Sequence, residues 1–200
     1  LLYRCPHCGH DPMEGAKDRA TCPGCGFAFS RGGEGGLIRI QDPAGEIWEV
    51  PGARLASAVE AWTAAEFEES GSGGGVFHKS RVRARQSGAE SPVWFEGELI
   101  GFAEAMSSAV EGTLEIDEEG LVLRMECGQV MRWPFMDIRA VQTSSSSLQF
   151  SPVSDGLVEF RFPDDSPFRW EGILRESLRR AYRRAGLGEI VEFQPRIVIE

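Results

Sequence analysis

Histidine is scarce in this sequence, and the motifs that identify many enzymes are missing. The 200 residues include three histidines, His7, His10 and His78, and none of them belongs to a metalloprotease motif. There is no nucleophile elbow, P-loop or dinucleotide-binding fingerprint, and the glycine-rich stretch 71–75 has neither a lysine nor the flanking strand and helix of a phosphate-binding loop. We therefore expect that this chain is not an enzyme by itself.

The sequence also lacks long apolar runs and an excess of basic residues. No stretch approaches the roughly 20 apolar residues of a membrane-spanning helix, and residues 1–9 have no apolar signal-peptide core. Lysine and arginine number 21 against 31 aspartates and glutamates, a formal net charge of −10. Because phosphates require a basic face, nucleic acid is disfavoured as the main partner. These features predict a soluble, cytoplasmic chain without a membrane span, and they leave peripheral contact at the inner membrane face open.

Cysteine is concentrated at the N-terminus, in two copies of the motif Cys-Pro-x-Cys-Gly. Two spacer residues bring both sulfurs to one ion, and the glycine permits the sharp turn that lets backbone amides approach the sulfurs. The 13 residues between Cys8 and Cys22 leave room for two short antiparallel strands, which is the zinc-ribbon plan. We expect one structural Zn²⁺ with four ligands: Cys5, Cys8, Cys22 and Cys25.

The motif leaves alternatives to a structural zinc open. Rubredoxin-type iron uses similar motifs, but with a longer intervening segment and aromatic residues around the metal. Disulfides are disfavoured by the spacing and by the lack of a secretory signal, and a catalytic zinc needs an open fourth position that four thiolates would close. His7 and His10 could replace a cysteine, but we expect both to be solvent-facing loop residues. Cys127 is expected to be a buried thiol in a strand.

The chain is expected to have four parts. These are a zinc ribbon at 1–30, a hairpin, helix and glycine-rich linker at 31–75, a β domain with its C-terminal helix at 76–186, and a strand or tail at 187–200. In the second part, extended segments at 37–40 and 47–50 flank a turn. Leu55, Val59, Trp62 and Phe67 then recur at helical spacing, which predicts the helix.

The region from residue 76 to residue 162 alternates β-rich runs, one of them 92–103, with turns. Ser166 is expected to cap a helix that begins at Pro167 and ends before Gly186. The predicted fold class is therefore mainly β with α. It consists of a zinc ribbon followed by a pleckstrin-homology-like small β-barrel, one end of which is plugged by the C-terminal helix.

Basic residues gather on this helix and on one strand, where they could meet anionic lipid headgroups or an acidic partner. Those of the helix are Arg175, Arg179, Arg180, Arg183 and Arg184. Those of the strand are Lys79, Arg81, Arg83 and Arg85. The competing explanation is a solvated polar face whose cations complement the helix dipole. Acidic pairs such as Asp164-Asp165 are expected to be solvated turn residues.

The order of segments resembles a known family. Residues 2–9 read LYRCPHCG and are followed by the second cysteine motif, the helix with Trp62, and strands around Glu98-Leu99 and Gly112-Thr113-Leu114. This resembles the region after the acyltransferase domain of certain bacterial lysophospholipid acyltransferases, where such a ribbon leads into a β-rich appendage. The resemblance implies transfer of an acyl chain from acyl-CoA or acyl carrier protein to a lysophospholipid, by a His-x4-Asp pair of a catalytic domain.

That catalytic pair is absent from this chain, since the residues five places after the three histidines are Pro12, Gly15 and Arg83. The chain begins at Leu1 rather than methionine, so we expect it to be the C-terminal piece of a longer protein or to lack its true start. The sequence predicts a non-catalytic zinc-binding interaction module that binds a protein partner or a membrane surface. The alternative is the accessory C-terminal part of a lysophospholipid acyltransferase.

Overall fold

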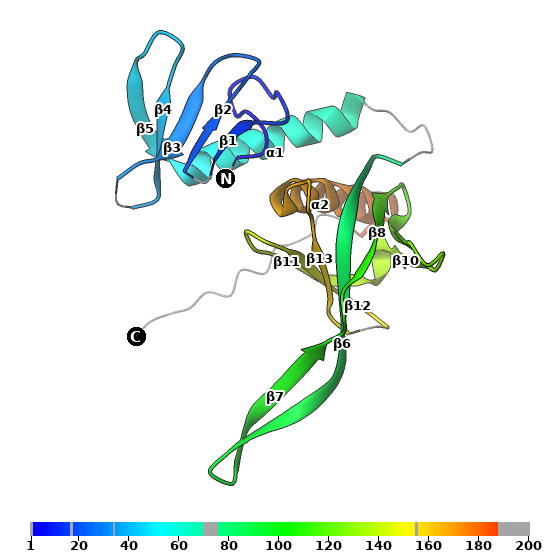
Figure 1. Ribbon diagram of the computed structural model, residues 1–200. Helices are drawn as coiled ribbons and strands as arrows, with labels where there is room; N and C mark the ends of the chain where they lie inside the picture. The colour runs from blue at the N-terminus through cyan, green and yellow to red at the C-terminus, as the bar shows by residue number, and fades with distance from the viewer. Residues whose placement is uncertain (1, 17, 34, 70–75, 155, 188–200) are drawn as a thin grey trace.

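The computed structural model describes residues 2–16, 18–33, 35–69, 76–154 and 156–187. The described chain is mainly β, as expected, with antiparallel sheets and two long helices, α1 (Gly52–Glu69) and α2 (Pro167–Arg184). Figure 1 shows α1 beside a small N-terminal sheet and α2 beside a larger sheet. The two helices contact each other, so they join the two halves of the molecule.

The N-terminal sheet has five strands that pair in chain order. They are β1 (Glu14–Ala16), β2 (Arg19–Thr21), β3 (Ala28–Arg31), β4 (Leu37–Gln41) and β5 (Ile47–Pro51). The expected hairpin is confirmed as β4 and β5. Phe29, Ile40 and Leu55 form a small core together with the thiols of Cys5 and Cys22. A core this small provides limited stability to this half of the molecule.

Helix α1 packs against this sheet through Leu55, which belongs to the small core. Val59 and Thr63 of the helix are also buried, and Thr63 Oγ1 lies 3.2 Å from the Tyr3 hydroxyl. Trp62, expected in the same apolar stripe, is 40 % exposed. Its ring lies over Gly9 rather than in the core, and its Nε1–H donates to the carbonyl oxygen of Pro6 at 3.2 Å. The helix is thereby fixed to the first cysteine motif. The Phe67 side chain and the glycine-rich stretch lie outside the described residues.

The larger sheet runs in the order β10-β9-β8-β6-β13-β12-β11, and β7 pairs with β6 outside this path. Its strands are β6 (His78–Phe95), β7 (Glu98–Met106), β8 (Val110–Ile116), β9 (Gly120–Met125), β10 (Val130–Pro134), β11 (Ile138–Thr143), β12 (Leu148–Pro152) and β13 (Val158–Arg161). Large apolar side chains, among them Phe150, Phe160, Trp170 and Leu174, fill the space between this sheet and α2.

The expectation of a closed barrel is wrong, since no pairing among the described residues joins the edge strands β10 and β11. β10 ends at Pro134, which has no N–H to donate, and a single 3-10 turn, η1 (Phe135–Asp137), leads into β11 without a hairpin. Helix α2 packs against η1, β11 and β12. The helix, rather than strand pairing, therefore covers this side of the sheet.

The interpretation of residues 92–103 as one strand is also wrong. Glu96 and Gly97 have φ values of 50° and 88°, which make a tight hairpin turn inside that run. β6 therefore continues beyond the larger sheet and pairs with β7 from Ser87 to Phe95. We call this hairpin, residues 87–106, the arm. Figure 1 shows it projecting away from the rest of the molecule.

Helix α2 begins and ends as expected. Pro167 is its first residue, Ser166 precedes it without a side-chain capping bond, and Gly186 follows its end with a φ of 70°. Residues 188–200, where a further strand is expected, lie outside the described residues. The division into four parts stays a prediction. None of the described helices is long and apolar enough to cross a membrane.

Candidate metal centre

The four N-terminal cysteines meet at one point between the two cysteine motifs. Their Sγ atoms all lie within 4.8 Å of one another. The Sγ atoms of Cys5 and Cys25 are 3.7 Å apart, and those of Cys8 and Cys22 are 3.6 Å apart. Four sulfurs at about 2.3 Å from one tetrahedral ion would be separated by about 3.8 Å. The thiols therefore lie close enough to bind one metal ion, and they are too far apart for disulfides.

Both motifs form the same backbone turn. The N–H of Gly9 donates to the carbonyl oxygen of Cys5 and that of Gly26 to Cys22, each at 2.9 Å. Both glycines have a positive φ, 74° and 77°. The turn directs backbone N–H groups at the sulfurs, those of His7 and Cys8 at Cys5 in the first motif. This explains why the sequence repeats a glycine directly after each second cysteine.

The chemistry of the donor set fits a soft divalent cation. Burial raises the pKa of the Cys5 thiol, although N–H groups of Cys8 and His7 act in the opposite direction. Burial likewise raises the pKa of Cys25, while for Cys22 hydrogen bonds outweigh burial and lower the pKa. Thiols crowded in this way do not ionise together unless a cation neutralises them. Four sulfur ligands are typical of structural zinc and of iron sites.

The other candidates near the metal centre lie outside the sulfur cluster. His7 is exposed and stacks on Phe27, with ring centroids 4.2 Å apart. His10 is exposed beside Gly24.

The expectation for Cys127 is wrong, because this residue is exposed in the turn between β9 and β10 rather than buried in a strand. Gly128, with a φ of 88°, makes that turn possible.

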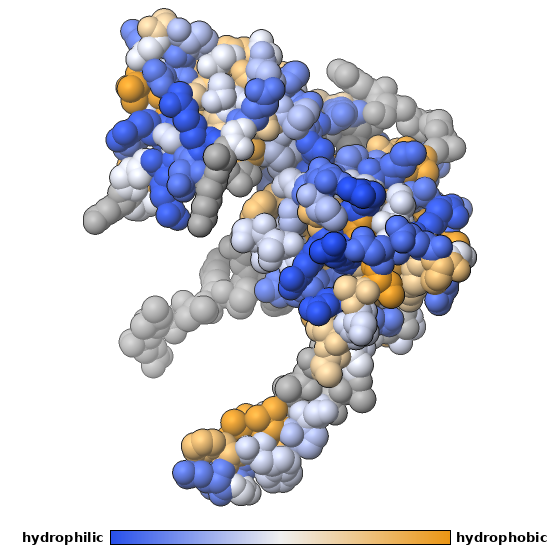
Figure 2. All heavy atoms as spheres, in the orientation of Figure 1, coloured by the Kyte–Doolittle hydropathy of each residue, from blue (hydrophilic) through white to orange (hydrophobic). Residues whose placement is uncertain are grey.

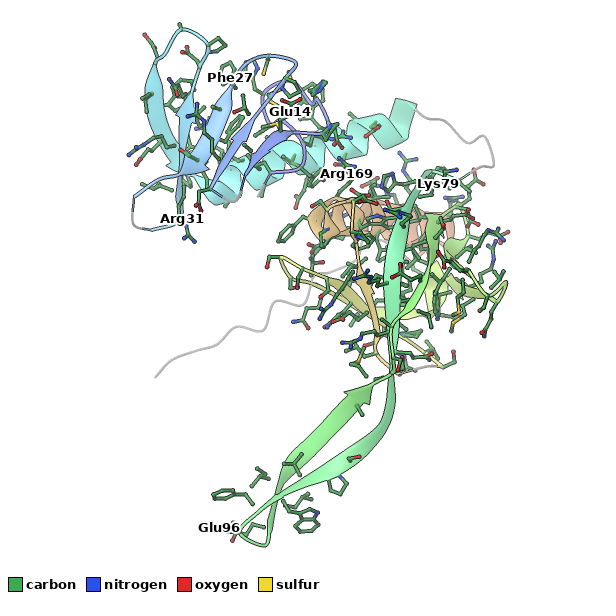
Figure 3. The ribbon with its side chains drawn as sticks, viewed as in Figure 1. Glu14, Phe27, Arg31, Lys79, Glu96 and Arg169 are labelled. Atoms are coloured by element: carbon green, nitrogen blue, oxygen red, sulfur yellow. The ribbon has the colours of Figure 1, made fainter. Side chains whose placement is uncertain are left out.

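A chain of ion pairs, partly buried except at Glu66, joins the cysteine cluster to the larger sheet. Arg4, next to Cys5, pairs with Glu66 of α1 and lies 3.6 Å from Asp11. Asp11 also pairs with Arg169 of α2. Figure 3 shows Arg169 between the two helices. The Arg169 guanidinium lies 5.7 Å from the ring centroid of Tyr3. The N-terminal segment that carries the first cysteine motif is thus connected to both helices by ion pairs.

The same chain of contacts ends on Asp165, whose side chain is 7 % exposed. The expectation that Asp164 and Asp165 are both solvated is therefore wrong for Asp165. Its Oδ1 accepts hydrogen bonds from Arg169 at 2.9 Å and from the N–H of Ser166 at 2.7 Å. Burial by itself would raise the pKa of Asp165, but hydrogen bonds from His78, Ser80 and Ser166 outweigh it and lower the pKa. Asp165 is thus held as a buried carboxylate.

Sequence reasoning missed a group of a serine, a histidine and an aspartate at this position. His78 Nε2 and Ser80 Oγ both bond the same oxygen, Oδ2 of Asp165, and Trp170 Nε1 donates to both Ser80 Oγ and that oxygen, at 3.1 Å each. In a hydrolase triad the histidine lies between serine and carboxylate and uses both ring nitrogens. Here the carboxylate lies in the middle. The group therefore fits a structural role at the start of α2.

No protein-family model and no curated protein matches the chain. A solved structure described as the C-terminal domain of an unknown protein from Leishmania infantum is similar, with a TM-score of 0.37 and 11 % identity over 60 % of this chain and 98 % of that chain. A likeness this distant carries no argument about function. The family resemblance described for the N-terminal segment remains a prediction.

The arginines of α2 do not form a free cationic face. Arg175 pairs with Glu171 at 2.7 Å, and Arg180 with Glu176 at 3.3 Å. Glu176 also lies 3.7 Å from Arg179 and 3.8 Å from Arg183. Arg184 is exposed in the last turn of the helix. Acidic neighbours therefore offset much of the positive charge that the sequence places on this helix.

The basic residues of β6 are partly neutralised in the same way. Arg81 pairs with Asp164, and Arg83 pairs with Glu111 at 2.7 Å. The spacing of charges in the sequence contained no sign of these partners, because they come from other strands and from the loop before α2.

Proposed function

We propose that this chain is a non-catalytic interaction module that one structural Zn²⁺ stabilises and that binds another protein. The single observation that carries the proposal is the cluster of four thiols, which offers a complete tetrahedral shell and leaves no position for a substrate or water. The metal would fix the two cysteine motifs to each other, and with them helix α1, whose Trp62 ring lies against Gly9.

Zinc is favoured over iron by the spacing of the cysteines, because the 13 residues between Cys8 and Cys22 are fewer than the intervening segment of rubredoxin-type sites. The aromatic surroundings do not separate the two metals, since Phe29 lies in the same small core as Cys5 and Cys22, and Phe27 packs against it. The pleckstrin-homology-like part of the proposal is supported by the strand order and by the C-terminal helix that packs on the open side of the sheet. Sheets of this layout are scaffolds for binding surfaces, and the fold by itself does not fix a ligand.

A protein partner is favoured over an anionic membrane by the charges. The formal net charge is −10, and Glu171 and Glu176 offset the arginines of α2. Exposed ion pairs hold their cations only weakly, so lipid headgroups could still compete for them. We nevertheless expect the negative net charge and these ion pairs to leave the chain with little attraction for an anionic surface.

The proposal is tested by measuring the metal and membrane binding together. We expect one zinc per purified chain by elemental analysis, and equal, low co-sedimentation with neutral and with anionic vesicles. The control is a chain with Arg179→Glu and Arg180→Glu, which should behave like the unaltered chain. Binding to anionic vesicles that these changes abolish would replace the protein partner by a membrane surface. A purified chain without metal would refute the zinc-stabilised module.

The accessory part of a lysophospholipid acyltransferase remains a second hypothesis, based on the resemblance of residues 2–9 and the order of segments. Its test is the reading frame upstream of Leu1. An upstream His-x4-Asp motif would favour it, and an immediate start codon would remove it.

A further inference from the structure

Apolar side chains are accessible at the end of the arm and in a cleft far from it. Figure 2 shows hydrophobic residues gathered near the end of the arm, where Trp94 and Phe95 are 61 % and 62 % exposed. The cleft lies between the N-terminal segment, α1 and α2, and has a volume of about 500 Å³. Because concave apolar sites are the ones that enclose a ligand, the cleft says more about its occupant than the protruding arm does.

The cleft has apolar walls, and one carboxylate stands out among its charges. Arg175 lines the cleft but already pairs with Glu171 at 2.7 Å. The exposed side chain of Glu60 lines the cleft as well. An occupant that matches these features is an apolar segment that carries one cation. The apolar walls include Leu2, Ile38, Leu55, Val59 and Phe168.

The chain contains such a segment in residues 188–200, which we call the tail and which lie outside the described residues. The tail has six large apolar residues and one cation, Arg196, which directly precedes Ile197-Val198-Ile199. Pro195 disfavours a helical conformation of the residue before it and favours an extended one. In an extended segment Ile197 and Ile199 face the same side and Arg196 faces the other.

The tail begins where it can run back along α2 to the cleft. The helix ends in a turn in which the N–H of Leu187 donates to the carbonyl oxygen of Tyr182, at 3.1 Å. Twelve residues separate Arg175, the nearest of the α2 residues that line the cleft, from Leu187, which is about 18 Å along a helix. Because an extended residue spans about 3.3 Å, a tail that runs back along α2 reaches the cleft by about residue 193.

The charges along this route match those of the tail. The last turn of α2 carries Arg183 and Arg184, and the first charged residues of the tail are Glu189 and Glu192. A tail that runs back along α2 therefore passes the basic end of the helix with its acidic residues. Its arginine comes later, at the level of the carboxylates of the cleft.

We infer that the tail docks in the cleft of its own chain, with Ile197 and Ile199 against the apolar walls and Arg196 beside Glu60. Two isoleucine side chains are a modest load for a cleft of about 500 Å³. A weak contact suffices, because a segment joined by a short linker has an effective concentration in the millimolar range. The docked tail contacts α1 as well as α2, and another protein that uses the cleft must first displace it.

The test is nuclear magnetic resonance of the full, zinc-loaded chain with labelled methyl groups of isoleucine, leucine and valine. We expect nuclear Overhauser effects from the methyl groups of Ile197 and Ile199 to those of Leu55 and Val59. Ala56→Trp fills the cleft from an exposed position on α1 and should abolish these signals. The matched control is Ala61→Trp, the same change at an exposed residue of α1 that does not line the cleft, and it should preserve them.

The charges are tested by reversing them one at a time and then together. Arg196→Glu and Glu60→Arg should each reduce the ratio of docked to free tail about threefold, since an ion pair at an exposed position is weak. The double variant should restore the ratio, because it exchanges the two charges. Glu46→Arg, in the exposed turn between β4 and β5, is the control for Glu60→Arg and should leave the ratio unchanged.

The inference is overturned if the unaltered chain gives no signal between tail and cleft, if Ala56→Trp keeps the signal, or if the double variant fails to restore docking. A mixture of labelled and unlabelled chains separates the two sources of a tail. Signals that disappear when labelled chains are diluted with unlabelled ones would place the tail in a second copy and overturn docking within one chain. The inference does not depend on the metal, so it can fail while the proposed module stands.

Discussion

Gly9 and Gly26 occupy the same place in the two cysteine motifs, and they allow a matched test of how α1 is attached. Both have a positive φ, and both donate their N–H to the carbonyl oxygen of the first cysteine of their motif. Alanine at either position would cost about 1 kcal/mol because of the backbone conformation alone. The surroundings of the two glycines differ.

A Cβ atom at Gly9 would lie 2.8 Å from two carbons of the Trp62 ring, whereas at Gly26 the nearest atom is Pro43 Cγ, at 3.2 Å. The Trp62 ring would have to move and would lose its hydrogen bond to Pro6, which is worth about 1 kcal/mol. Overpacking adds about 1 kcal/mol, at the low end of its range because Trp62 is partly exposed. We expect Gly9→Ala to cost about 1–2 kcal/mol more than Gly26→Ala.

The assay is guanidinium unfolding at a fixed concentration of free zinc, followed by circular dichroism. The difference between the two variants should disappear when Trp62→Ala is added, because the clash and the hydrogen bond are then both absent. Equal costs for Gly9→Ala and Gly26→Ala in the presence of Trp62 would refute the attachment of α1 to the first motif.

Three further results are expected. Removal of the metal with a chelator, or the change Cys22→Ser, should unfold the N-terminal sheet and leave most of the larger sheet intact. Amide hydrogen exchange measures the two sheets separately, and simultaneous loss of protection in both would contradict this expectation. Asp165 has a pKa that is lower in the folded than in the unfolded chain, so its contribution to stability is present above about pH 4 and is lost as the pH falls through the folded value. Unfolding free energies measured between pH 2 and 7 should therefore fall less steeply below about pH 4 in Asp165→Asn than in the unaltered chain. Arg169→Met removes a partner from both Asp11 and Asp165 and should cost about 2 kcal/mol by chemical denaturation, since Asp11 is partly buried and keeps Arg4 nearby. Asp11→Asn should recover part of that loss, and additive costs would rule out direct coupling.

The local elements were predictable where a residue type has a strong physical preference. The repeated Cys-Pro-x-Cys-Gly motif predicted four sulfurs that do meet, because two spacer residues and a glycine leave few other conformations. Pro167 and Gly186 likewise marked the bounds of α2. In the turn between β8 and β9, Asp117 accepts two backbone hydrogen bonds, which is the usual way in which aspartate stabilises such turns.

The long-range features could not be read from local patterns. The apolar run on both sides of Glu96 looked like one strand, because exposed and buried apolar residues are indistinguishable in sequence. Asp165 looked like a turn residue, since its partners Arg169 and His78 come from different elements. The open edge between β10 and β11 depends on the packing of α2, which strand propensity does not encode.

Whether Cys5, Cys8, Cys22 and Cys25 hold one zinc ion in a closed shell, as we propose, can be measured by X-ray absorption at the zinc edge of the purified chain. We expect one zinc per chain with four sulfur neighbours at about 2.3 Å and no nitrogen or oxygen ligand. A shell with fewer sulfurs and a light-atom neighbour, or cysteines joined in disulfides, would contradict it.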